Sequence, residues 1–198
     1  MLSHIFCCIF LFHILLRIRA LYKKRCNKLF QNVASNVVCY MVNGGINMST
    51  AQPIRNIDEL EAFRRFYLDN EPNLRNYALI CLGVNSALRI SDLLELRWKD
   101  VYDIKEKHFR KHLVTTEKKT GKETRIAINK STRKGLSRYM ESLDNVTGEG
   151  YIFPGRYDNT ALSRSQAFRI IKHAADILNL ENGISCHSMR KTFGYYAW

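Results

Sequence analysis

The chain has 198 residues, of which 46% are hydrophobic and only three are proline. This length and composition are typical of one medium globular domain, alone or with a tail, and they exclude an intrinsically disordered protein. The formal net charge is +13. So large a basic excess favours a polyanionic partner, with nucleic acid ahead of an anionic membrane, although a generally basic solvated surface is the alternative.

The six cysteines do not have the spacing of a metal site. Only Cys81 and Cys186 follow Met48, and the others precede it: Cys7, Cys8, Cys26 and Cys39. There is no Cys-x-x-Cys pair, so we expect reduced thiols in a reducing, cytoplasmic compartment, without a metal or another cofactor. Cys81 lies in an apolar helical pattern and is expected to be buried.

Residues 1–47 differ in character from the rest of the chain, because they contain six Lys or Arg residues and no Asp or Glu. Their apolar run, residues 5–16, is shorter than the about 20 residues that span a membrane. Basic residues follow this run instead of preceding it, which does not fit a secretory signal. Gly44-Gly45 could be encoded by a ribosome-binding site placed before a start codon at Met48. We therefore expect residues 1–47 to be a non-domain extension that is not translated; the alternative is a genuine membrane-proximal tail.

The domain expected over residues 48–198 begins with two helices. The first starts near Asn56, with Asp58 as its N-cap, and carries an apolar stripe of Leu60, Phe63, Phe66 and Tyr67. Pro72 separates it from a second helix, whose apolar stripe is Leu74, Tyr77, Ala78, Cys81 and Leu82. After a break at residues 85–87 comes Arg89, and Ser91 is expected to cap a short helix over residues 92–96.

The hydrophobic period then changes from helical to alternating. Residues 112–116 and 124–129 read as strands, joined by a basic turn with Gly121 at the hairpin tip. Ser131 or Thr132 is expected to cap a helix that runs to about Leu143. Residues 151–154 are a short extended piece, and Ser163 is expected to cap a further helix that ends at residues 182–183. No internal repeat is present, which favours one domain.

Four residues carry the candidate chemistry. Arg89 precedes a helix, and Asp92, three residues on, could hold its guanidinium in place. Lys119 lies in the basic turn, where an ammonium can reach a phosphate. His187 and Arg190 open a last helix and share one face of it. A phosphoryl-transfer site needs cations on the phosphate oxygens and a proton donor for the leaving group, and these side chains could supply both without a metal.

The pieces that carry these residues resemble the catalytic domain of tyrosine recombinases, the phage integrase family. The likeness spans about residues 54–198 and lies in ALRISDLLELRW, EKKTGKETRIAI, YIFPG and CHSMRKTFGYYAW. It implies a mainly helical α+β fold with a small antiparallel β-sheet, and cleavage and rejoining of duplex DNA through a covalent phosphotyrosine. By motif position, Arg89 and Arg190 would be the two catalytic arginines, Lys119 the lysine and His187 the histidine.

The sequence departs from the family pattern in two ways. The family has a second histidine or tryptophan, and then the nucleophilic tyrosine, a few tens of residues after the His-x-x-Arg motif; the chain stops before that point. Tyr195 and Tyr196 share a helix with Arg190 and are expected to be packing residues. The residues between Met48 and Arg89 are also too few for the DNA-clamping domain that precedes the catalytic domain in this family.

We therefore expect a truncated recombinase domain from a mobile element that does not cleave DNA as it stands. The alternative is a non-catalytic DNA-binding module that occupies recombination sites or competes for them. Double-stranded DNA is the expected partner, and the family implies a homo-oligomer on DNA. A small-molecule substrate is not expected, and membrane association is not favoured.

Each site residue also has a plainer explanation. Arg89 could be a surface arginine paired with Asp92, and Lys118 could replace Lys119 as the functional lysine of the turn. His187 alone could cap a helix. Positive side chains at a helix N-terminus oppose the helix dipole, however, and so call for an anion nearby.

Overall fold

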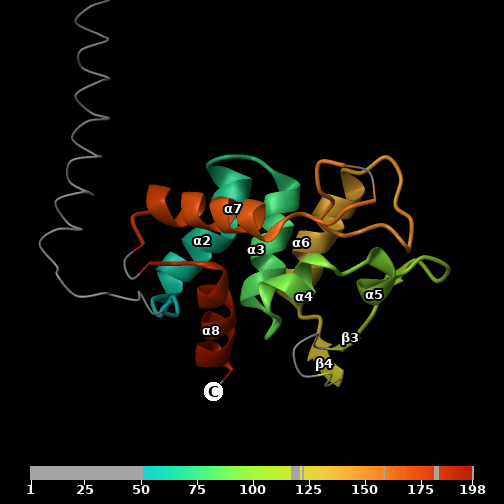
Figure 1. The fold of residues 1–198 in the computed structure, drawn as a ribbon, viewed down its shortest axis with the longest axis horizontal. Helices are drawn as coiled ribbons and strands as arrows, with labels where there is room; N and C mark the ends of the chain where they lie inside the picture. Colours follow the sequence, from blue (N-terminus) through green and yellow to red (C-terminus); the bar gives the residue numbers. More distant parts are fainter. Residues whose placement is uncertain (1–50, 117–120, 122, 158, 181–182, 198) are drawn as a thin grey trace, which may run out of the picture. The chain divides into compact units, whose positions relative to one another are not determined.

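A buried central helix organises the fold of the computed structural model (Figure 1). The structure describes residues 51–116, 121, 123–157, 159–180 and 183–197. The helices in this part are α2 (Ile57–Asp69), α3 (Leu74–Val84), α4 (Ile90–Leu94), α5 (Trp98–Val101), α6 (Lys130–Glu141), α7 (Arg164–Ile177) and α8 (Cys186–Tyr196). Helix α3 is the central one, and it packs against α2, α6 and α8.

Helix α3 is apolar nearly all round, and its residues from Asn76 to Val84 are all buried. One hydrophobic core lies between α3, the α4–α5 segment, the strands and α6, and includes Leu79, Leu93 and Leu136. The other lies between α2, α3, α7 and α8, and includes Phe63, Ile80 and Ile171. A helix that is hydrophobic on every side needs such cover on both flanks.

The strands form two small antiparallel pairs. Strand β1 (Tyr102–Asp103) pairs with β2 (His108–Phe109), and β3 (His112–Thr116) pairs with β4 (Glu123–Ala127). In the second pair Leu113 lies opposite Ile126, and both are buried in the core beside α6. The mainly helical α+β fold with a small antiparallel sheet is thus confirmed, and both predicted strands are present within two residues of their expected ends.

Helix caps account for most differences from the predicted elements. Asn56, not Asp58, caps α2, because its side-chain oxygen accepts hydrogen bonds from the backbone of Asp58 and Glu59. Asn129, not Ser131 or Thr132, caps α6. Ser91 lies inside α4, whose N-cap position is occupied by Arg89 in extended conformation. Ser163 caps α7 as predicted, but this helix ends at Ile177, earlier than expected, and Asn179 then adopts a φ of 50°.

The apolar stripe predicted for α2 is buried, and that of α3 is buried except for Leu74, which is partly buried; Cys81 and Trp98 are both in the core. Helix α5 and strands β1 and β2 were not predicted, because elements of two to four residues are too short to show a hydrophobic period. None of the helices in the described part of the chain is both long and apolar enough to cross a membrane.

Helix α8 approaches α3 closely at one glycine. A Cβ atom built on Gly83 would lie 2.6 Å from the sulfur of Met189. Met189 is buried, so its side chain fills the space that a larger residue at position 83 would occupy. This contact sets the distance between α8 and the centre of the domain.

Candidate phosphate-binding site

A pocket of about 1080 Å³ is formed where α4, α7 and the first turn of α8 come together. Its walls come from three separate stretches of the chain. The described lining residues are Leu88, Arg89, Ile90, Ser91, Asp92, Arg164, Ser165, Phe168, Arg169, Ser185, Cys186, His187 and Arg190. Four arginines and one histidine thus face one carboxylate, so the pocket suits an anion.

Arg89 enters the pocket from the N-terminus of α4, next to a buried carboxylate. Its Nη1 atom lies 4.0 Å from Oδ2 of Asp92, whose side chain is only 3% exposed. This Oδ2 accepts no hydrogen bond from the described residues. The guanidinium attracts this carboxylate across 4.0 Å, so Asp92 can help to hold Arg89 in place.

His187 and Arg190 enter the pocket from the first turn of α8. His187 is exposed and Arg190 is half-buried. Residues three apart lie on one face of a helix, so both side chains can contact the same ligand. The free backbone N–H groups and the positive end of the helix dipole add to the attraction for an anion at this terminus.

Helix α7 contributes two arginines that the sequence reasoning missed, Arg164 and Arg169. Both are exposed, together with Ser165 and Phe168, while Ala167 on the opposite side of the helix is in the core. A signal was available, because arginines and other polar residues lie on the side of the helix opposite its buried apolar residues. The sequence did not show that this face turns toward Arg89.

Three of the four predicted site residues, Arg89, His187 and Arg190, therefore line one pocket. The fourth, Lys119, and its alternative Lys118 lie outside the described residues. The structure does place the strands on either side of that turn, and Gly121 has the positive φ of 65° expected at a hairpin tip.

Neither of the two candidate tyrosines lines the pocket. The Tyr196 hydroxyl donates a hydrogen bond of 2.7 Å to the backbone oxygen of Arg55. The two rings meet edge to face with centroids 5.1 Å apart, and each residue is about half exposed. Tyr196 is thus engaged in packing and in a contact with another segment.

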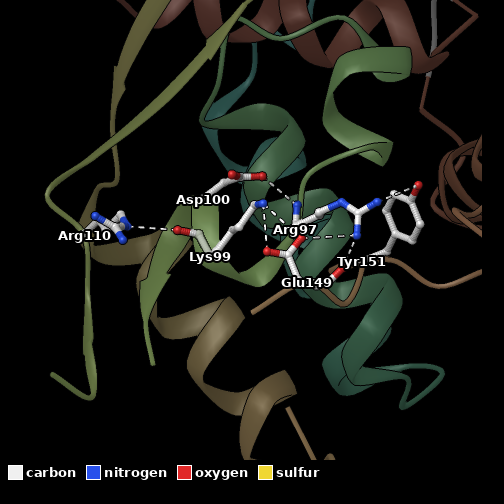
Figure 2. Close-up of polar contacts among 6 residues, drawn as sticks. All are labelled: Arg97, Lys99, Asp100, Arg110, Glu149 and Tyr151. Carbon is white, nitrogen blue, oxygen red and sulfur yellow. Dashed lines mark hydrogen bonds and ion pairs between the residues drawn. The ribbon is translucent and has the colours of Figure 1, made fainter. Parts of the chain in front are cut away.

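A second polar cluster, shown in Figure 2, serves to hold the chain together. The guanidinium of Arg97 lies over the ring of Tyr151, 4.5 Å from its centroid. Lys99 forms hydrogen bonds of 2.9 Å with both carboxylate oxygens of Glu149, which lower the pKa of that carboxyl group. The positive charges of Arg97 and Lys99 thus lie against the ring of Tyr151 and the carboxylate of Glu149. These contacts attach the segment after α4 to residues 149–151. They also weaken the attraction of the cluster for a further anion.

Among the described residues, no group of three or more His, Cys, Asp or Glu side chains is arranged to hold a metal ion. The chemistry visible in the pocket is that of the arginines, the histidine and the helix terminus. Such a set can neutralise the oxygens of a phosphodiester and exchange a proton through His187.

Comparison with known proteins gives consistent matches. A family model described as the phage integrase family matches residues 56–196. The probable integrase/recombinase YoeC of Bacillus subtilis (strain 168) is 37% identical over 149 residues, which cover 75% of this chain and 76% of that protein. The integrase fold was predicted from the motifs, and these two findings confirm the resemblance.

Solved structures match at the level of the fold. XerA recombinase is 20% identical, with a TM-score of 0.55, over 73% of this chain and 50% of that one. Lambda integrase bound to DNA is 20% identical, with a TM-score of 0.53, over 72% of this chain and 49% of that one. The chain thus spans about half the length of these two solved structures.

Proposed function

The chain belongs to the phage integrase family, and on this premise we propose that it acts in site-specific DNA recombination by binding the phosphate at which a DNA strand is cut. The observation that carries the proposal is the convergence of Arg89, His187 and Arg190 in one pocket. Residues 48–198 would form the catalytic-type domain, and residues 1–47 an extension outside it.

In this proposal the two arginines have the same task. Arg89 and Arg190 hold the non-bridging oxygens of the phosphate, because a planar guanidinium can donate two parallel hydrogen bonds to them. His187 donates a hydrogen bond to an oxygen of the phosphate. Lys119, assigned by motif position alone, would match the lysine that protonates the leaving oxygen in members of the family that cut the strand.

Duplex DNA is the proposed partner. The basic charge of the chain and the four arginines of the pocket support it, and the structure of lambda integrase that shares this fold was obtained with DNA bound. We also propose that several copies of this protein assemble on one duplex. It predicts complexes of more than one protein per duplex in sedimentation.

The finer part of the proposal is that this chain binds the phosphate without cutting the strand. Among the described residues that line the pocket there is no tyrosine, and the Tyr196 hydroxyl is bonded to Arg55. The same observation supports the second candidate function, a DNA-binding module that occupies recombination sites or competes for them.

Substitution of Arg190 tests the binding site. We expect Arg190→Ala and Arg89→Ala each to weaken binding to a duplex of about 30 base pairs by roughly tenfold or more, because each removes a charged hydrogen-bond donor to phosphate. Fluorescence anisotropy measures the affinity. Arg65→Ala is the matched control, since Arg65 is paired with Asp69 on α2 and does not line the pocket. Equal affinities for all three variants would refute the site.

Strand cleavage is tested with a nicked duplex that traps a covalent intermediate. We expect no protein–DNA adduct on a denaturing gel, although the same duplex is bound. An adduct that maps to a tyrosine by mass spectrometry would overturn the binding-only proposal and leave the phosphate site in place. Selective binding to one attachment sequence, above binding to unrelated DNA, would favour the competitor function.

A further inference from the structure

The segment before α2 crosses the side of α8 that faces away from the pocket. We call residues 53–56 of this segment the strap. The backbone N–H of Ile54 donates a hydrogen bond of 2.9 Å to the hydroxyl of Thr192, and the backbone oxygen of Arg55 accepts one of 2.7 Å from Tyr196. The strap therefore contacts two successive turns of α8.

The strap contacts and the phosphate-binding residues lie on different faces of α8. Successive residues are about 100° apart around a helix, so Thr192 and Tyr196 fall within about 40° of each other. Viewed down the helix axis, Thr192 and Tyr196 lie roughly opposite the pair His187 and Arg190. Because a helix is stiff, a shift or rotation of α8 at Thr192 and Tyr196 also moves His187 and Arg190.

The Thr192 hydroxyl makes one donated and one accepted hydrogen bond in this arrangement. It accepts from Ile54 and donates to the backbone oxygen of Ser188, one turn earlier. Both Ile54 and Thr192 are buried, at 2% and 1% exposure, so water cannot replace the bond. Ser188 in turn accepts a hydrogen bond of 3.1 Å on its own hydroxyl from the backbone of Ser185. The row of bonds therefore extends from the strap to the start of α8, beside His187.

The contact of Met189 with Gly83 limits how closely α8 approaches α3. The apolar packing of α8 against α3 and α7 is not directional, so it limits the rotation of the helix about its axis, and its position along that axis, less sharply than hydrogen bonds do. Two hydrogen bonds one turn apart do fix both, since hydrogen bonds weaken steeply when their length or angle changes.

From this geometry we propose that the strap sets the orientation of α8, and that Thr192 and Tyr196 are positioning residues for His187 and Arg190. Neither touches the phosphate; each acts through the helix. The functional consequence rests on the proposed phosphate-binding function, whereas the effect on α8 itself does not.

The first test follows hydrogen exchange in the full chain. Thr192→Val keeps the shape of the side chain and removes the hydroxyl, and Thr192→Ser keeps the hydroxyl. We expect Thr192→Val to speed amide exchange at residues 189–192 by about tenfold, because the buried N–H of Ile54 loses its partner and the strap no longer holds α8, while amides of α6 stay unchanged. Thr192→Ser should restore slow exchange. Uniformly faster exchange in both helices, or no change in α8, would overturn the proposal.

Tyr196→Phe provides a second variant, since Tyr196 is 43% exposed and its loss should leave the core intact. We expect it to speed exchange at the same amides by a smaller factor. If Thr192→Val does not fold, unchanged exchange in Tyr196→Phe overturns the proposal.

DNA affinity supplies the second readout and separates the two proposals. Thr192→Val should weaken binding in the wild-type background and have little further effect when Arg190 is already alanine, because it acts through that residue. Additive losses would overturn the positioning role. If Arg190→Ala itself has no effect on binding, the proposed function fails, and the exchange experiment still decides whether the strap orients α8.

Discussion

The thiol of Cys81 is enclosed where α3 meets α6. The residue is 1% exposed, and a Cβ atom on Gly135 of α6 would lie only 3.0 Å from its own Cβ. Burial in this apolar contact raises the pKa of Cys81 to about 11. Because the native state holds this proton more tightly than the unfolded chain does, the stability gained from the buried thiol is present below pH 9 and is lost as the pH rises toward 11.

Alkylation tests this burial. We expect Cys81 in the native protein to resist iodoacetamide at pH 8, because the thiolate fraction is about one in a thousand and the sulfur is covered. Peptide mass spectrometry after labelling with and without denaturant measures the difference. Rapid labelling of Cys81 in the native protein would contradict the packing of α3 against α6.

At the residue scale the sequence predicted burial better than capping. The apolar stripe on α2 follows from the helical period, and all four of its residues are buried. The cap of that helix was assigned to Asp58 and belongs to Asn56. Both residue types cap well, and which of them adopts the extended backbone of a cap depends on contacts made by the preceding segment, which a local pattern does not contain.

At the scale of elements, the β3–β4 hairpin depends on one glycine. Gly121 has a φ of 65°, which a residue with a branched side chain adopts only with strain. We expect Gly121→Val to lower the free energy of unfolding by about 1–2 kcal/mol, and Gly121→Asn to lower it less, because asparagine tolerates this region. Urea unfolding of both variants measures the difference, and equal stabilities would contradict the turn geometry.

The predictable elements are those long enough to show a period. Strand β4 alternates over its five residues and α7 repeats over four turns, so their existence could be inferred. The convergence of Arg164 and Arg169 with Arg89 could not be inferred in the same way. A period shows which face of a helix is buried, but it does not show which other segment the polar face approaches.

At the scale of the whole molecule, the cations of the surface ion pairs and those of the pocket have different surroundings. Several surface cations have a carboxylate partner, as in Arg65–Asp69 and Lys172–Asp176. The described pocket lining instead has four arginines and one histidine with a single, buried carboxylate. Within the described part of the chain, the pocket is thus one place where several cations gather around a single carboxylate.

This distribution predicts the salt dependence of DNA binding. We expect the logarithm of the association constant to fall linearly with the logarithm of salt concentration, since each neutralised phosphate releases counterions. Arg89→Ala and Arg190→Ala should each reduce the slope by about 1. Titrations between about 50 and 300 mM salt measure it. An unchanged slope in both variants, with a reduced slope in Arg65→Ala, would place the bound phosphate elsewhere.

The strap joins α8, which carries part of the pocket, to a segment far away in the sequence. Ile54 and Thr192 are 138 residues apart in sequence, and joining the ends of so long a flexible loop costs about 4 kcal/mol of entropy. Such high contact order slows folding, so α8 is expected to dock late, onto a body that α3 has already organised. During synthesis the strap leaves the ribosome long before its partner, and a nascent chain with most of its core in place would still lack His187 and Arg190 in the pocket.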